Sequence, residues 1–211
     1  MKSGEHGFLP GFGQVCNVRL VAGAMVTHGI RLFQPTSLLL FHWTVLHVDE
    51  AVEPVDLEAS ADLVAITFHT PSAPHAYDLA ARFRQRGITV ALGGPHVTLP
   101  PDEAQAHADV IFIGEAEYSW PRFLAEFETG NHRQRYCSEP PSLDKAPMSR
   151  QDLFHRRDHA AGVLFATRGC AHRCDFCTLA MMYQSQVRKR PVLAEEGLGD
   201  WADALDREDR R

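Results

Sequence analysis

The chain has 211 residues, of which 45% are hydrophobic and 23% are charged, and its formal net charge is −6. This hydrophobic content is sufficient for a packed core and excludes a disordered chain, and the length allows one large or two small domains. The acidic balance excludes an extended basic surface for nucleic acid, because the basic run Arg188-Lys189-Arg190 is short. We therefore expect a globular protein that does not bind nucleic acid directly.

The termini and cysteines indicate a cellular location. Residues 1–13 lack the charged and then apolar pattern of a secretory leader, and the apolar stretch 38–46 is interrupted by His42. That stretch is also far shorter than the roughly 20 residues of a membrane-spanning helix. The cysteine count is odd, with three of the 5 clustered, which argues against a disulfide framework. We expect a cytoplasmic protein without a membrane span.

In chain order, the first two strands are expected at residues 17–21 and 44–48. A regular alternation of strands and helices follows them. Short β-branched runs alternate with helical stretches from Asp62 to Gly130, which predicts a parallel sheet covered by helices. The expected strands are 62–67, 88–92 and 109–113, and the expected helices are 74–86, 101–108 and 119–129. Ser119 is expected to cap the last of these helices, with Pro121 in its first turn.

The sequence changes character after this region. Residues 138–147 are rich in proline, serine and charge without an apolar period, which is typical of a linker. A short strand is then expected at 162–166, directly before a cysteine-rich loop. We therefore divide the chain into an α/β domain at 1–136, a linker at 137–160 and a second unit at 161–211.

The cysteine-rich loop places Cys170, Cys174 and Cys177 in a C-x3-C-x2-C spacing, with Phe176 before the last cysteine. Three thiolates fill three corners of a four-iron cluster and leave one iron open to a small molecule. A zinc site completed by His172 is the first alternative, although zinc knuckles normally pair two C-x2-C units. Three unligated cysteines are the second alternative, but free cysteines are usually buried singly.

This spacing resembles the signature of the radical S-adenosylmethionine (radical SAM) enzymes, with a match extending over residues 165–191. The resemblance implies that the three cysteines hold a [4Fe-4S] cluster and that Phe176 lines the adenine side of S-adenosylmethionine. It also implies reductive cleavage of that cofactor to a 5′-deoxyadenosyl radical, with an electron donor such as flavodoxin or ferredoxin.

Two glycine turns end predicted strands: Gly93-Gly94-Pro95-His96 and Gly114-Glu115-Ala116-Glu117. In open parallel sheets ligands bind beyond the carboxyl ends of the strands, and glycine lets a backbone approach a large ligand. A purely steric role for these glycines is an equal alternative. For the two glutamates, capping of the following helix is expected in preference to acid–base chemistry.

Together with Thr67-Phe-His-Thr70, these turns resemble the cobalamin-binding domain that precedes the radical SAM core in B12-dependent radical SAM enzymes, over roughly 44–136. The resemblance implies a flavodoxin-like parallel sheet with helices on both faces. It also implies a set of residues near the corrin or its nucleotide tail: Thr67, Thr70, Gly93, Gly94, His96, Gly114 and Glu115.

The chain departs from related patterns in two places. It has no Asp-x-His-x-x-Gly string, so the resemblance implies cobalamin held without a histidine ligand, and His96 is expected to hydrogen-bond its turn. The run 31–38 is at best a degraded version of the proline-glycine-leucine turn near the start of such domains.

In a complete relative, the resemblance implies radical chemistry on a small-molecule substrate, with methyl transfer to carbon as the leading reaction. Only 34 residues follow Cys177, and 194–211 is a charged tail, so we expect an incomplete first unit of the radical SAM partial barrel and little turnover by this chain. We assign no catalytic side chain. A non-catalytic cobalamin-binding module and an α/β domain with a structural metal loop are the alternatives.

Overall fold

A computed structural model describes residues 17–22, 44–50, 54–137, 139–144, 146, 166–183 and 185–190. In these ranges six strands form one parallel sheet in the order β2-β1-β3-β4-β5-β6. The strands are β1 (Asn17–Ala22), β2 (Thr44–Asp49), β3 (Leu63–Thr67), β4 (Thr89–Gly93), β5 (Val110–Ile113) and β6 (Arg135–Cys137). The first five follow the flavodoxin-like order 2-1-3-4-5, which confirms the expected fold class for this domain.

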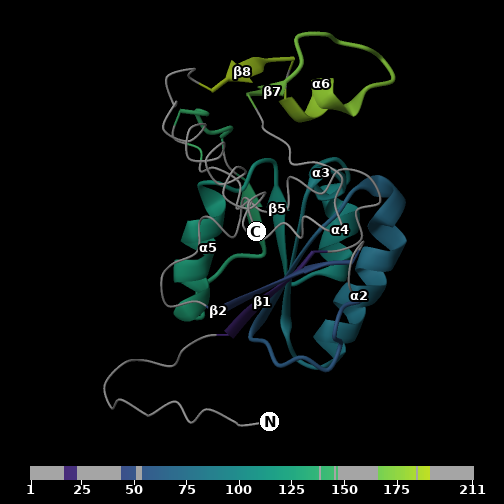
Figure 1. Cartoon of the computed structure of the whole chain (residues 1–211), viewed down its shortest axis with the longest axis vertical. Helices are drawn as coiled ribbons and strands as arrows, with labels where there is room; N and C mark the ends of the chain where they lie inside the picture. The colour runs from purple at the N-terminus through teal and green to yellow at the C-terminus, as the bar shows by residue number, and fades with distance from the viewer. Residues whose placement is uncertain are drawn as a thin grey trace, which may run out of the picture.

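Helices cover both faces of the sheet (Figure 1). They are α2 (Ala73–Gln85), the short α3 (Pro95–Thr98), α4 (Pro101–His107) and α5 (Ser119–Glu128), with the 3-10 turn η2 (Thr70–Ser72) ahead of α2. In Figure 1, α2 and α4 lie on one side of the sheet and α5 lies on the other. This arrangement follows from the right-handed crossovers that parallel strands require.

The core forms two layers because neighbouring residues of a strand point to opposite faces. Val64 and Ile66 of β3 pack with Phe83 of α2, whereas Leu63 packs in the other layer with Phe123 of α5. All five side chains are at most 1% exposed. The continuous apolar strands predicted by the sequence are therefore buried on both sides, as in other parallel sheets.

The predicted strands and helices between residues 62 and 129 are confirmed, with ends that differ by one or two residues. The prediction that Ser119 caps α5 is wrong, because Tyr118 is the cap residue and Ser119, only 5% exposed, is the first residue of the helix. The sequence analysis also missed β6, which extends the sheet to Cys137.

Beyond the sheet, the structure describes Ala166 to Arg190 without Gln184. Strand β7 (Thr167–Gly169) pairs antiparallel with β8 (Val187–Lys189), and α6 (Thr178–Tyr183) lies between them in sequence. In Figure 1 this hairpin and α6 lie together beyond α3. The strand expected at 162–166 lies almost entirely outside the described residues, as do Cys16, the run 31–38 and the tail 194–211. The barrel stays a prediction.

The predicted linker packs against the rest of the molecule where it is described. Leu143 and Ala146 are only 3% and 5% exposed, although the segment has no apolar period. None of the described helices is both long and apolar enough to cross a bilayer.

Candidate functional site

The two glycine turns and the Thr67–Thr70 segment, which the sequence indicates as a ligand site, lie at the carboxyl edge of the sheet. Thr67 ends β3 beside Gly93, which ends β4, and Gly114 directly follows β5. The strand order reverses between β1 and β3, and a ligand of an open α/β sheet binds at such a switch point. Thr70 and Gly114 are exposed at this edge, so both residues are accessible to a large ligand.

Gly94 is required by the protein's own packing. Its φ of 101° and ψ of −176° lie in a region that is essentially restricted to glycine. A Cβ at this position would lie 2.6 Å from Thr67 Oγ1 and 2.8 Å from the carbonyl oxygen of Phe68. The backbone of the β4 turn is therefore pressed against the end of β3, which supports the steric explanation for this glycine.

Thr98 joins the two glycine turns, a role that the sequence analysis did not assign. Its hydroxyl donates to the carbonyl oxygen of Gly94 at 3.0 Å and accepts from the backbone N–H of Gly114 at 3.0 Å. The threonine stands four residues after Gly94 at the end of a short helix, where its hydroxyl reaches back one turn. The ends of β4 and β5 are thereby held together.

His96 lies in a hydrogen-bonded network and is only 6% exposed. Its Nδ1 is 3.1 Å from Thr70 Oγ1, and its Nε2 is 3.1 Å from the Tyr77 hydroxyl and 3.4 Å from Glu103 Oε1. Tyr77 in turn donates to Glu103 at 3.2 Å. Both ring nitrogens therefore have protein partners, which join the turn of His96 to Thr70, Tyr77 and Glu103.

The same network perturbs Tyr77. Burial, and then the neighbouring Glu103 carboxylate, raise the pKa of Tyr77 to about 12. Both effects disfavour the phenolate. Tyr77 therefore stays a hydroxyl that donates to Glu103 and accepts from His96.

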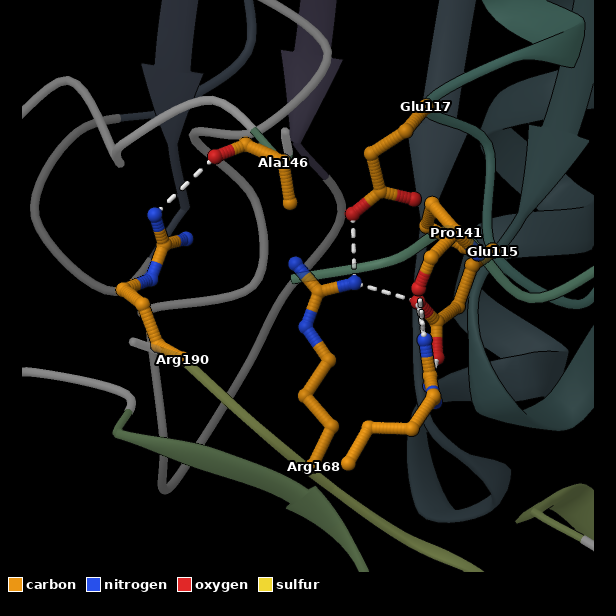
Figure 2. A network of polar contacts seen from close by, with 7 residues as sticks. Glu115, Glu117, Pro141, Ala146, Arg168 and Arg190 are labelled. Carbon is orange, nitrogen blue, oxygen red and sulfur yellow. Dashed lines mark hydrogen bonds and ion pairs between the residues drawn. The ribbon is translucent and has the colours of Figure 1, made fainter. Parts of the chain in front are cut away.

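Glu115 and Glu117 contact arginines of the hairpin formed by β7 and β8. Arg168 donates to Glu115 Oε2 and lies 2.5 Å from Glu117 Oε1, and Arg188 donates to both oxygens of Glu115. Figure 2 shows the Arg168 guanidinium between the two glutamates. The expectation that these carboxylates cap α5 is wrong, since α5 has no acidic residue in its first turn and begins after a Tyr118 without a side-chain cap.

Burial and the neighbouring charges shift the pKa values of Arg168 and Arg190 in different directions. Burial lowers the pKa of Arg168, but Glu117 and then Glu115 outweigh that effect, so its pKa lies above the ordinary value. Burial and the nearby Arg168 lower the pKa of Arg190. The two carboxylates therefore offset the cost of withdrawing the charged Arg168 side chain from water, where it is 7% exposed.

The cysteine loop begins directly after β7. Cys170 and Cys177 are partly exposed and Cys174 is exposed, and the Cys177 N–H donates to the Cys174 carbonyl at 3.0 Å. Phe176 is 92% exposed. Among the residues the structure describes, no three potential ligands are gathered into a metal-binding group, and His172 is exposed. Three accessible thiols in one loop nevertheless have the donor chemistry that an iron–sulfur cluster takes.

The comparison with protein families decides the identity of the sheet domain. The profile of the B12 binding domain matches residues 14–124, which is more than half of the chain. The chain belongs to the B12-binding domain family. The match includes β1 to β5 and both glycine turns, so the residues at the carboxyl edge belong to the B12-binding domain.

Several characterised proteins are similar over longer stretches. Bacteriochlorophyllide d C-8(2)-methyltransferase of Chlorobaculum tepidum is 35% identical over 64% of this chain and 32% of its own length. Bacteriochlorophyllide d C-12(1)-methyltransferase of the same organism is 27% identical over 82% of this chain and 40% of its own length. Hopanoid C-2 methylase of Rhodopseudomonas palustris is 26% identical over 80% of this chain and 33% of its own length. The chain thus spans roughly a third of the length of these relatives.

Proposed function

We propose that the B12-binding domain holds cobalamin at the carboxyl edge of β3, β4 and β5. The observation that carries the proposal is the family match over a sheet whose order reverses between β1 and β3. In this proposal Gly93, Gly94 and Gly114 let the ligand approach the backbone of the two turns, and Thr67 and Thr70 lie beside them. His96 holds Thr70 in place through a hydrogen bond and is not a cobalt ligand in this proposal.

The cysteine loop supports a second cofactor. We infer that Cys170, Cys174 and Cys177 hold a [4Fe-4S] cluster and that Phe176 contacts the adenine of S-adenosylmethionine. Such a cluster would supply an open iron for S-adenosylmethionine and an electron for its cleavage. The side chains of this chain contribute by binding and orientation, and the loop is anchored close to the sheet edge because Arg168, two residues before Cys170, pairs with Glu115.

The reaction class rests on the relatives. Three of them are named for methylation of bacteriochlorophyllide d or a hopanoid. We propose that the protein takes part in cobalamin-dependent methyl transfer to carbon of a small-molecule substrate, with a flavodoxin or ferredoxin as the electron donor. The domain division at 1–136, 137–160 and 161–211 belongs to the same proposal.

A cofactor titration tests the proposal. The purified chain is reconstituted anaerobically with iron and sulfide, titrated with hydroxocobalamin and analysed for bound metal. We expect saturable cobalamin binding, about four irons per chain and broad absorption near roughly 400 nm.

The alternatives give different outcomes in the same titration. Cobalamin binding without a stable cluster would favour a non-catalytic cobalamin carrier. Zinc in place of iron would favour a structural metal loop. Absence of cobalamin binding would contradict the first part of the proposal.

A further inference from the structure

Two arginines face each other on the hairpin that carries the cysteine loop. Arg168 of β7 is the direct cross-strand partner of Arg188 of β8. Like charges directly opposite one another destabilise an antiparallel pair. Both are also withdrawn from water, with side chains 7% and 18% exposed. The hairpin therefore needs negative charge supplied from outside itself.

The B12-binding domain supplies this charge from the turn after β5. Glu115 accepts hydrogen bonds from both guanidiniums, and Glu117, with a side chain only 4% exposed, pairs with Arg168. Arg188 also donates to the Pro141 carbonyl at 2.6 Å. Buried charge pairs of this kind are costly to break, because the remaining partner is left charged and unpaired.

The contacts continue in both directions from this group. On the sheet side, Gly114 precedes Glu115 and is tied through Thr98 to the Gly94 turn. On the hairpin side, Gly169 lies between Arg168 and Cys170, and a Cβ there would overlap the Gln186 carbonyl oxygen. A short series of close contacts thus connects Cys170 with the carboxyl edge of the sheet.

We propose that Glu115, Glu117, Arg168 and Arg188 form a positioning junction that sets the cysteine loop at a fixed place over the carboxyl edge of the B12-binding domain. This inference rests on the proposed function and refines it. Glu115 acts through the arginines, so it is a positioning residue and not a corrin contact. The three ion pairs of the junction occupy both carboxylates, so neither glutamate is left for a ligand.

Charge reversal with rescue tests the junction. Amide hydrogen exchange is measured over residues 166–190 in the full chain for Arg188→Glu, and for the double variant Glu115→Arg/Arg188→Glu. Arg188→Glu should raise amide exchange in β7 and β8 by about tenfold or more, because the new carboxylate then lies against the carboxylate of Glu115. The double variant should recover most of the protection, since positions 115 and 188 then carry opposite charges again and the group returns to two positive and two negative side chains.

Lys189→Glu is the matched control, because Lys189 is exposed and lies next to Arg188 on the same strand. It should change exchange by less than about twofold. Exchange in β4 and β5 reports whether each variant is folded. Equal effects of Arg188→Glu and Lys189→Glu, or no recovery in the double variant, would overturn the junction.

A second measurement separates the junction from cofactor contact. Glu115→Gln should leave the hydroxocobalamin Kd within about threefold of the parent value, whereas a corrin contact would weaken binding by about tenfold or more. The weaker binding would overturn the positioning role. If the parent chain binds no hydroxocobalamin, the proposed function fails, while the exchange comparison still decides the junction.

Discussion

His96 and Thr70 join the turns that follow two neighbouring strands of the B12-binding domain. The Nδ1 of His96 lies 3.1 Å from Thr70 Oγ1, which links the loop after β4 to the loop after β3. Because the other ring nitrogen lies near Tyr77 and Glu103, the histidine also ties this edge to α2 and α4. Histidine is a common metal ligand, but the contacts of His96 connect two loops and two helices of the domain.

Replacing His96 by alanine should reduce stability. Thr70 and Tyr77 would lose a buried partner, and we expect a loss of about 1–3 kcal/mol in urea unfolding. His75→Ala, at a largely exposed position, should cost less than about 1 kcal/mol. If cob(II)alamin bound to the parent chain shows nitrogen hyperfine splitting from a protein ligand, and His96→Ala abolishes it, the histidine is a cobalt ligand and this assignment is wrong.

Replacing Gly94 by alanine should strongly destabilise the folded protein. The new Cβ would lie against Thr67 and the backbone of Phe68 at a φ of 101°, so we expect a loss of about 2–4 kcal/mol. Gly87→Ala is the matched control, because its φ is 76° but nothing lies within 4 Å of the added carbon. It should cost about 1 kcal/mol. Equal losses would show that backbone conformation alone, and not close packing, requires Gly94.

Tyr77 should make stability depend on alkaline pH. The pKa of Tyr77 is about 12 in the folded protein and 10.0 when unperturbed. A raised folded pKa means that its contribution is fully present below pH 10 and is lost as the pH rises toward 12. In chemical unfolding between these pH limits, the free energy of unfolding should fall more steeply with pH for the parent chain than for Tyr77→Phe. If the free energy of unfolding falls in parallel with pH for the two proteins, the raised pKa of Tyr77 is contradicted.

Serine substitutions at Cys170, Cys174 and Cys177 should each remove the reconstituted iron or reduce it to a small fraction. A cluster held by three thiolates has no spare protein ligand. Cys137→Ser is the control, because this exposed thiol stands at the end of β6, away from the loop in sequence. His172→Ala separates the metals, since it should leave iron unchanged, whereas loss of bound metal would favour a Cys3His zinc site.

The sequence by itself determined the elements whose signals are local. The apolar runs of β3 and β5 and the periodicity of α2 need no distant partner to be recognised, and the alternation of strands and helices predicts a parallel sheet. The cysteine spacing and the glycine turns are equally local, so the sequence is sufficient to identify these candidate residues. The three-residue strand β6 was missed because so short a segment has no period of its own.

Only the tertiary structure decided what these residues do to one another. Glu115 meets Arg168 across 53 positions of sequence and Arg188 across 73, and no spacing rule connects charges so far apart. Local reasoning assigned the glutamates to a helix cap because the helix was nearby in sequence. The pairing depends instead on a hairpin that places two arginines side by side, away from water, where carboxylates must come from another part of the chain.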